Sequence, residues 1–313
     1  MSSEQALVAA VDIGGTKIAG ALVGAEDGLL SRRTRLPTPA GAPGDTVFAA
    51  VAGVLARLRE APEWSRVRWI GLGSAGPVDA GRGLVSPVNI AGWRGFPLVE
   101  RVRGLAPGLP VVLTGDGVAM TAAEHWRGAA RGHHNALCLV VSTGVGGGLV
   151  LGGTLHPGPS GNAGHIGHIS VDLDGDPCPC GGRGCLEGLA SGTAIARRAH
   201  AAGWRPADGD ASAAGVAAAA RAGDPLALAA FDRAAQALAA GIAATATLVE
   251  LEVAVIGGGV AQSGDVLFGP LGKWLGEYAG LSYVRGLEVR PALLGTDAGL
   301  VGAAAAALWA GGR

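Results

Sequence analysis

Lysine is nearly absent from this chain of 313 residues, since it supplies only Lys17 and Lys273 among 24 basic side chains. Acidic residues number 25, so the formal net charge is −1. A chain without excess charge offers no broad basic surface, which argues against a nucleic-acid groove or a membrane-surface patch. Because lysine is so rare here, Lys17 in a glycine-rich segment is a candidate for a specific task.

Long apolar runs are also missing. No stretch of 18 apolar residues is free of both charge and glycine, so no transmembrane helix is predicted. Residues 1–5 lack the basic and apolar regions of a signal peptide. We therefore expect a cytoplasmic protein with no membrane partner, in which cysteine thiols stay reduced.

Glycine, in contrast, is abundant, with 56 residues, well above the average of about 7%. Hydrophobic residues make up 49% of the chain, which argues against disorder, and the glycines lack the three-residue period of collagen. At this length one hydrophobic core rarely suffices, so two domains are expected. The excess glycine therefore belongs to an ordered protein.

Strand, glycine turn and strand are predicted over residues 6–23 and again over 137–153. These units indicate either an internal duplication, with two similar α/β domains across a cleft, or two unrelated hairpins. Further strands are expected at 67–73, 110–114, 252–256 and 287–294, a long loop at 84–97, and helices at 44–60 (N-cap Asp45), 117–130, 191–202, 211–222, 224–250, 264–279 and 297–310.

The first glycine turn has the chemistry of an anion site. It does not match the phosphate loop of nucleotide triphosphatases, because strands flank it on both sides. The N–H groups of Gly14 and Gly15 can point at one group of oxygens, while Thr16 adds a hydroxyl and Lys17 a positive charge. Asp12 can hold Mg²⁺ directly or through water. An ordinary Gly-Gly hairpin turn is the alternative.

Two further glycine loops suit a nucleotide. Residues 142–148 fail as a dinucleotide-binding motif because a strand follows them, but they suit a loop that passes close to phosphates. Residues 257–259 lie between a strand and a helix, where backbone without side chains can pack against a base or ribose. Each loop is weak evidence alone, and the three together predict a nucleotide site.

Three of the four cysteines are clustered, at Cys178, Cys180 and Cys185, and His168 precedes them by ten residues. Three thiolates and one imidazole complete a closed, tetrahedral Zn²⁺ site of the structural type. Buried reduced cysteines are the alternative. Cys138 lies in an apolar strand and is predicted to belong to the core.

Asp116 ends a predicted strand and precedes a helix, which is a usual place for a catalytic group in an α/β protein. A helix-capping aspartate is the alternative. Asn89, in a loop, is either a ligand-binding residue or an ordinary turn residue.

Together these motifs resemble the ROK family of bacterial sugar kinases and repressors. The resemblance implies an α/β, two-domain actin-like or hexokinase-type ATPase fold with an interdomain active-site cleft and a zinc-binding loop. The expected domains are residues 1–115 plus 296–313 and residues 116–295. The motifs that carry the resemblance are DIGGTK (12–17), GDGVAMTAAEHW (115–126), STGVGGG (142–148), AGHIGH (163–168), CPCGGRGCLE (178–187), GGGV (257–260) and GTDAGLVGAA (295–304).

The resemblance also implies residue roles. Asp116 would be the base that accepts the proton of the sugar 6-hydroxyl, and the zinc would hold a sugar-binding loop in shape. The residues expected to bind ATP and Mg²⁺ are Asp12, Gly14, Gly15, Thr16, Lys17, Thr143, Gly144, Gly146, Gly258 and Gly259. Those expected at the sugar are Gly76, Asn89, Gly115, Asp116, His165, His168 and Glu187, and those at Zn²⁺ are His168, Cys178, Cys180 and Cys185.

Two positions depart from the family's glucokinases. Gly115 replaces an asparagine, and His165 replaces a glutamate whose carboxylate accepts two hydroxyl hydrogen bonds. The AGHIGH form resembles the family's N-acetylmannosamine kinases, so we predict a 6-kinase for N-acetylmannosamine. Glucokinase activity, or sugar binding with little turnover, remains the alternative.

A repressor is disfavoured, because the family's repressors carry an additional N-terminal DNA-binding domain and often lack the phosphate loop. Here the first motif begins at residue 12 and the nucleotide loops are intact. We therefore expect small-molecule partners, sugar and ATP, and no nucleic acid. Apolar C-terminal helices favour a homodimer or homotetramer.

Overall fold

The structure is a computed structural model that describes residues 5–206 and 209–312, so residues 1–4 of the N-terminal segment lie outside it. The described chain divides into two compact units. Unit 1 runs to Arg131 and adds Leu155–Ala163 and the residues from Thr296 onward, whereas unit 2 consists of Gly132–Thr154 and Gly164–Gly295. Each unit is built around its own sheet.

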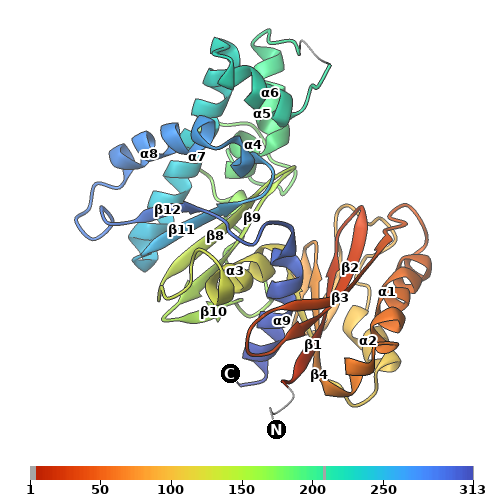
Figure 1. The fold of residues 1–313 in the computed structure, drawn as a ribbon. Coiled ribbons are helices and arrows are strands. Elements are labelled where there is room, and N and C mark those ends of the chain that lie inside the picture. The colour runs from red at the N-terminus through yellow and green to blue at the C-terminus, as the bar shows by residue number, and fades with distance from the viewer. Residues whose placement is uncertain (1–4, 207–208, 313) are drawn as a thin grey trace. The chain divides into compact units, whose positions relative to one another are not determined.

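The sheet of unit 1 has the strand order β3-β2-β1-β4-β7 (Figure 1). The predicted hairpin is present, because β1 pairs antiparallel with β2 from Leu7 opposite Gly24 to Ile13 opposite Ile18. Strands β4 and β7 extend the sheet in parallel. The bounds are β1 Leu7–Ile13, β2 Lys17–Gly24, β3 Leu30–Pro37, β4 Val67–Ser74 and β7 Val111–Gly115, with the short pair β5 Val78–Asp79 and β6 Leu84–Val85 beside them.

Strand β1 shows how this sheet is covered on both faces. Its apolar residues alternate, so that Val11 and Ile13 join one buried cluster while Val8 and Ala10 join another. Helices lie on both sides of the sheet, α1 on one and α9 on the other (Figure 1). The helices of unit 1 are α1 Gly44–Arg59, α2 Leu98–Leu105, α3 Asp116–Arg127 and α9 Ala298–Ala310, and its short 3-10 turns are η1 Pro62–Arg66 and η4 Gly295–Asp297.

Helices α3 and α9 pack together without intervening side chains. A Cβ at Gly302 of α9 would overlap the carbonyl oxygen of Ala119 in α3. Because of this close approach, α3 belongs with unit 1. The domain boundary after residue 115 stays a prediction.

The sheet of unit 2 has the order β10-β9-β8-β11-β12. If the strands of each sheet are counted from one to five along the chain, both sheets have the order 3-2-1-4-5. Each sheet has an antiparallel hairpin beside two parallel strands. This repeated topology favours the internal duplication over two unrelated hairpins. The bounds are β8 Ala136–Val141, β9 Val145–Leu151, β10 Thr154–His156, β11 Val253–Gly257 and β12 Glu288–Pro291.

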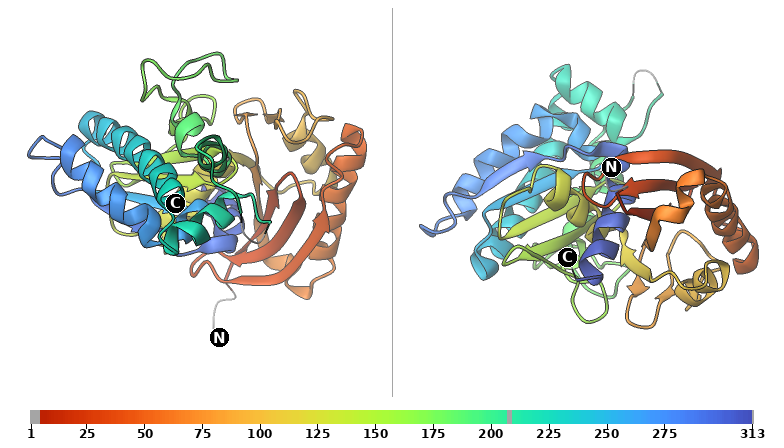
Figure 2. Two further views of the ribbon diagram at one scale, coloured as in Figure 1. Left: turned by 90° about the horizontal axis from the view of Figure 1, so that it is seen from above. Right: turned by 60° about the horizontal axis from the view of Figure 1, so that its bottom comes forward.

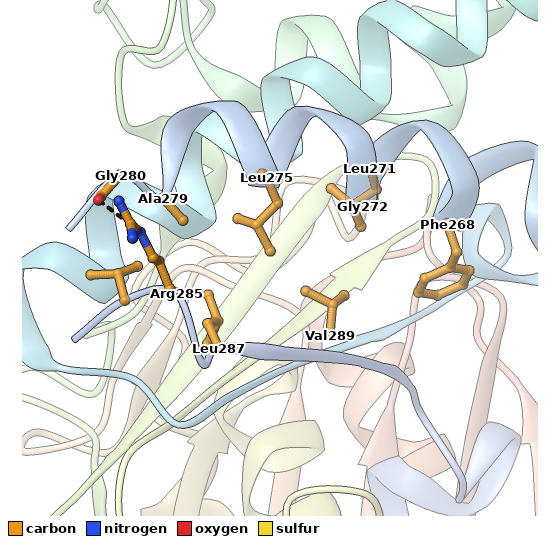
Figure 3. Close-up of a pocket in the computed structure, with 11 residues that line it drawn as sticks. Phe268, Leu271, Gly272, Leu275, Ala279, Gly280, Arg285, Leu287 and Val289 are labelled. Carbon is orange, nitrogen blue, oxygen red and sulfur yellow. Dashed lines mark hydrogen bonds between the residues drawn. The ribbon is translucent and has the colours of Figure 1, made fainter. Parts of the chain in front are cut away.

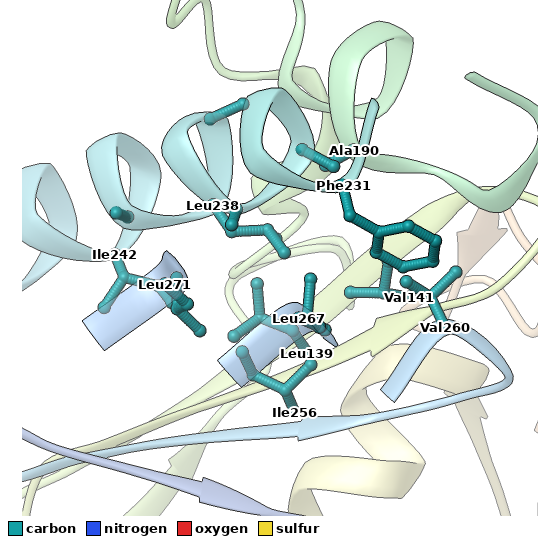
Figure 4. Packing of buried hydrophobic residues seen from close by; sticks show 14 of the residues in the cluster. Leu139, Val141, Ala190, Phe231, Leu238, Ile242, Ile256, Val260, Leu267 and Leu271 are labelled. Carbon is teal, nitrogen blue, oxygen red and sulfur yellow. The ribbon is translucent and has the colours of Figure 1, made fainter. Parts of the chain in front are cut away.

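Helix α7, Pro225–Val249, lies at the centre of the unit 2 core. Its length and composition would let it cross a membrane, but Phe231, Leu238 and Ile242 are buried against the sheet and against α8 (Figure 4). Helices α7 and α8 run side by side in the view from above (Figure 2). The remaining elements of unit 2 are η2 Ile166–His168, α4 Leu186–Ala190, α5 Gly192–Ala201, α6 Ala213–Arg221, η3 Val260–Ser263 and α8 Asp265–Tyr278.

Two local predictions were wrong, and strand β3 and helix α2 were not predicted. Strand β9 starts at Val145, so Gly146 and Gly147 lie inside a strand rather than in the turn. Asp45 does not cap α1, because the N-cap position is Pro43 and the Asp45 carboxylate pairs with Arg101 at 2.8 Å.

Candidate active site

The turn between β1 and β2 is held by its own backbone. The N–H of Gly14 donates to the carbonyl of Lys17 at 3.0 Å, and the hydroxyl of Thr38 donates to the carbonyl of Gly14 at 2.7 Å. Neither Gly14 nor Gly15 adopts the left-handed conformation that a two-residue hairpin turn with Gly-Gly uses. The turn therefore differs from the ordinary hairpin, and it leaves Thr16 and Lys17 exposed.

Asn89 lies against this turn. A Cβ at position 15 would come within 2.5 Å of the Asn89 Nδ2, so Gly15 is required for the close approach. The loop that carries Asn89 is tied back by the N–H of Val88, which donates to the carbonyl of Gly76 at 3.3 Å. Two residues expected at the sugar, Gly76 and Asn89, thus lie on segments that are bonded to each other on either side of the β5–β6 pair, and Asn89 lies beside the expected phosphate turn.

Asp12 is a carboxylate without a hydrogen-bond partner among the described residues. It lies at the end of β1 and packs on Gly299 in the first turn of α9, where a Cβ would lie 2.5 Å from its Oδ2. Its pKa is raised from 3.8 to about 6, mainly by burial and also by the negative charge of Asp116, while the positive charge of Lys17 opposes the shift. The Asp12 carboxylate, buried and without a hydrogen-bond donor among the described residues, offers the oxygen ligands that a hard cation such as Mg²⁺ prefers.

Asp116 is the first residue of α3 and is exposed. Its Oδ1 accepts the N–H of Gly117 at 2.7 Å, but the N-cap position belongs to Gly115 and no side chain caps this helix. Asp116 therefore does not act as the helix cap that its sequence position also allowed.

Gly115 has extended backbone angles, φ −71° and ψ 155°, which any residue can adopt. A Cβ there would lie 3.8 Å from Val78 Cγ2, which is ordinary van der Waals contact. The structure thus has room for a Cβ at this position, so neither the backbone conformation nor a contact of the Cβ requires the glycine.

In unit 2, two of the predicted nucleotide loops line one cavity of about 380 Å³. Thr143 precedes β9, and Gly259 follows Gly258 after β11. A cavity of this size matches a small-molecule site. The full lining is Ser142, Thr143, Gly192, Thr193, Ala196, Ser212, Ala213, Ala214, Gly259, Val260 and Ser263.

Most of that lining was not predicted from the sequence. It comes from the N-terminal turns of α5 and α6, whose caps are Ser191 and Ser212. A serine before each alanine-rich helix is a readable capping signal. The sequence holds no signal, however, that places both helix ends beside Thr143.

The four predicted zinc ligands come together. The Cys178 Sγ lies 3.7 Å from the His168 Nδ1, and the Cys180 Sγ lies 3.7 Å from the Cys185 Sγ. All four ligand atoms lie within 4.8 Å of one another. A tetrahedron with Zn–S bonds of about 2.3 Å has edges of about 3.8 Å, so the cluster fits a zinc ion.

The protonation of Cys185 is consistent with a site that needs a cation. Burial and the neighbouring Cys178 and Cys180 together raise the pKa of this thiol to about 12, with burial as the larger cause. A bound dication reverses this preference, because a coordinating thiol is deprotonated.

His165 and Glu187 flank the metal cluster in the sequence. The His165 ring stacks on the ring of the ligand His168, with 5.1 Å between centroids, and His165 is exposed. The Glu187 Oε2 accepts the N–H of Val145 at 2.9 Å. His165 thus contacts one of the four clustered residues, and Glu187 follows another, Cys185, by two positions.

Another cavity of unit 2, about 590 Å³, lies between α8 and β12 (Figure 3). Apolar side chains such as Leu271, Leu275 and Val289 line it, and Arg285 at its end donates to the carbonyl of Gly280 at 3.2 Å. None of the predicted site residues lines this cavity.

Comparison with known proteins extends along nearly the whole chain. Residues 8–310 match the ROK family. A glucokinase of Thermotoga maritima is 35% identical over 309 residues, which cover 94% of this chain and 95% of that protein. An N-acetylmannosamine kinase of Yersinia pseudotuberculosis is 38% identical over 302 residues, covering 96% and 97%. The solved structure of a ROK family glucokinase from Streptomyces griseus, in complex with glucose and AMPPNP, superposes with a TM-score of 0.80 at 36% identity, covering 96% of this chain and 99% of that one.

Proposed function

Because the chain belongs to the ROK family, we propose that it is an ATP-dependent sugar kinase that transfers the γ-phosphate to the 6-hydroxyl of a hexose or N-acetylhexosamine. We propose N-acetylmannosamine as the preferred acceptor. Relatives named for glucose and for N-acetylmannosamine are similar to this chain to nearly the same degree. The choice between the two sugars therefore depends on individual residues of the site.

The nucleotide is assigned to the cavity beside Thr143 and Gly259. Its walls are small side chains and exposed backbone, which suit the flat faces of a base and ribose. The exposed Thr16 hydroxyl and Lys17 ammonium of unit 1 are donors of the kind that phosphates need. Phosphoryl transfer needs such positioned donors more than covalent chemistry.

Asp116 is proposed as the base. Its exposed carboxylate can accept the proton of the attacking hydroxyl, which is the step that makes the oxygen a better nucleophile. Asp12 would hold Mg²⁺ directly or through water, and when bound this ion neutralises the charge that gathers on the phosphates. His168 and the three clustered cysteines would hold a structural zinc.

His165 is the observation that carries the choice of sugar. A carboxylate at this position can only accept hydrogen bonds, whereas an imidazole can donate one to the carbonyl oxygen of an acetamido group. Stacking on His168 fixes the plane of the His165 ring. Glucose, with a hydroxyl in place of the acetamido group, gains less from such a donor.

Glucokinase is the second candidate, and the glucokinases among the relatives favour it. Gly115 argues against both sugars equally, because glycine offers no side chain to a sugar hydroxyl. If this loss is large, the chain would bind sugar with little turnover.

The experiment is an ADP-release assay with MgATP and six acceptors: glucose, mannose, fructose, glucosamine, N-acetylglucosamine and N-acetylmannosamine. We expect the highest kcat/KM for N-acetylmannosamine and a value at least about 10-fold lower for glucose. His165→Glu should reverse this order at equal stability. Glucose as the best substrate of the unchanged protein would refute the assignment of the sugar. The assignment as a kinase would be refuted if the unchanged protein bound sugar but released ADP no faster than Asp116→Asn.

Localisation and assembly are part of the same proposal. A kinase that uses ATP and a free sugar is expected in the cytoplasm, with those two small molecules as partners. We also propose a homodimer or homotetramer, which sedimentation of the purified protein tests.

A further inference from the structure

Residues 187–193 anchor the nucleotide loop of unit 2 through three hydrogen bonds. The N–H of Gly192 donates to the carbonyl of Ser142 at 2.7 Å, and the Thr193 hydroxyl donates to the carbonyl of Thr143 at 3.0 Å. The third anchor is the 2.9 Å bond from the Val145 N–H to the Glu187 Oε2. Of the three, only Glu187 uses a charged group, and charged acceptors make the stronger hydrogen bonds.

The backbone around Glu187 is itself fixed. It follows the metal ligand Cys185 by two residues, and the N–H of Leu186 donates to the carbonyl of Ile169 at 3.0 Å. Two arginines of α5 hold the carbonyls after it, Arg197 that of Gly188 at 3.1 Å and Arg198 that of Leu189 at 3.0 Å. The carboxylate therefore projects from a rigid base.

The loop is shaped to receive this carboxylate. A Cβ at Gly144 would lie 2.5 Å from the Glu187 Oε2, so a larger residue there would displace the carboxylate from its present position. At the carbonyl end of the same residue, a Cβ at Gly167 would overlap the oxygen of Val145. The backbone of Val145 is thus contacted by Glu187 at its N–H and approached by Gly167, the neighbour of the metal ligand His168, at its carbonyl.

We propose that Glu187 is a positioning residue for the nucleotide, in addition to any contact with sugar. Its Oε2 holds the Val145 N–H and so keeps the loop beside the Thr143 cavity in one conformation. Its Oε1 accepts no hydrogen bond from the described residues, which leaves that oxygen for a sugar hydroxyl. This inference rests on the proposed function, because it assumes that the Thr143 cavity takes ATP.

Measuring nucleotide binding in the absence of sugar separates the positioning role of Glu187 from its contact with sugar. The experiment uses the full-length, zinc-loaded protein and measures the Kd of Mg²⁺-AMPPNP by isothermal titration calorimetry, with zinc content determined for every sample. Glu187→Ala should weaken binding about 10-fold, which corresponds to about 1.4 kcal/mol. Glu187→Gln keeps a carbonyl oxygen that accepts the same N–H, so its Kd should stay within about 3-fold of the unchanged protein. Glu187→Gln should nevertheless raise the KM for sugar, because it lacks the carboxylate proposed to accept a sugar hydroxyl.

Two further variants complete the set. Thr193→Val removes the second side-chain anchor and should weaken AMPPNP binding about 3-fold. Glu277→Ala, on the exposed side of α8, is the matched control and should leave the Kd unchanged.

The outcomes are distinct. A Kd for Glu187→Ala within twofold of the unchanged protein overturns the positioning role, as does an equal loss in Glu187→Gln. If Glu187→Ala loses zinc, Thr193→Val with full zinc decides: weaker binding supports the proposal, and unchanged binding overturns it. Absence of AMPPNP binding by the unchanged protein would instead refute the proposed function.

Discussion

Replacing Asp12 by asparagine is expected to stabilise the protein at neutral pH while it abolishes phosphoryl transfer. The pKa of Asp12 lies at about 6 instead of the ordinary 3.8. A difference of this size costs the folded state about 3 kcal/mol when the carboxylate is ionised. Asparagine carries no charge, although burying its amide without partners costs about 1–3 kcal/mol. A net gain of about 1 kcal/mol at pH 7.5 would raise the Tm by about 2–4 °C.

The pH dependence is the sharper measurement, because the cost of burying the amide is the same at every pH. Below pH 3.8 the folded and unfolded chains both hold the Asp12 proton, so the carboxyl group has no effect on stability. As the pH rises, the unfolded chain releases this proton first, and stability falls until the folded group has ionised above about pH 6. The cost is about 1 kcal/mol at pH 4.5 and about 3 kcal/mol at pH 7.5.

Calorimetric unfolding of the metal-free protein at pH 4.5, 6.0 and 7.5 tests this. The advantage of Asp12→Asn over the unchanged protein should widen by about 2 kcal/mol from the lowest to the highest pH. Asp45→Asn is the control, because this exposed carboxylate has only a surface ion pair with Arg101, worth about 0–1 kcal/mol. An advantage that stays constant or narrows with rising pH would refute the reasoning, and so would full kinase activity in Asp12→Asn.

Four further predictions concern single changes. Asp116→Asn should retain sugar affinity and lower kcat by about 10²–10⁴, and near-normal turnover would exclude it as the base. Chelation of zinc should lower sugar affinity and Tm together, and a zinc-free sample with unchanged activity would contradict this. Gly115→Asn should fold normally, because its Cβ has room beside Val78, and should lower the KM for sugar; a rise in KM would contradict it. Gly302→Ala should destabilise the protein by about 1–3 kcal/mol, because its methyl group would overlap the carbonyl of Ala119, and an unchanged Tm would show that α9 can shift.

Several parts of the fold could be predicted because their signals are local. The β1–β2 hairpin follows from alternating apolar residues around a glycine turn, and the long helix α7 follows from its apolar periodicity. The metal cluster was also predictable, because three of its ligands lie within eight residues of chain, Cys178 to Cys185. In each case the atoms that meet are close in the sequence.

Other features depend on contacts between distant segments. Gly146 and Gly147 were predicted to lie in a turn, but they belong to strand β9. A Cβ at Gly147 would lie 2.9 Å from the carbonyl oxygen of Gly164, which is a contact between distant segments. The cavity beside Thr143 depends on the ends of α5 and α6, which no short motif marks. Similarly, the raised pKa of Asp12 arises from burial under α9, whose residues lie almost 300 positions away.

The position of α9 also has a consequence for the order in which the protein is made. Unit 1 contains the first residues of the chain, yet it is completed only by Ala298–Ala310. All of unit 2 therefore leaves the ribosome before unit 1 is whole, and at about 5–20 residues per second this takes on the order of ten seconds. During that time the face of β1 that carries Val8 and Ala10 has no helix over it. A chaperone that binds the newly made N-terminal sheet would cover this apolar face until α9 has been made.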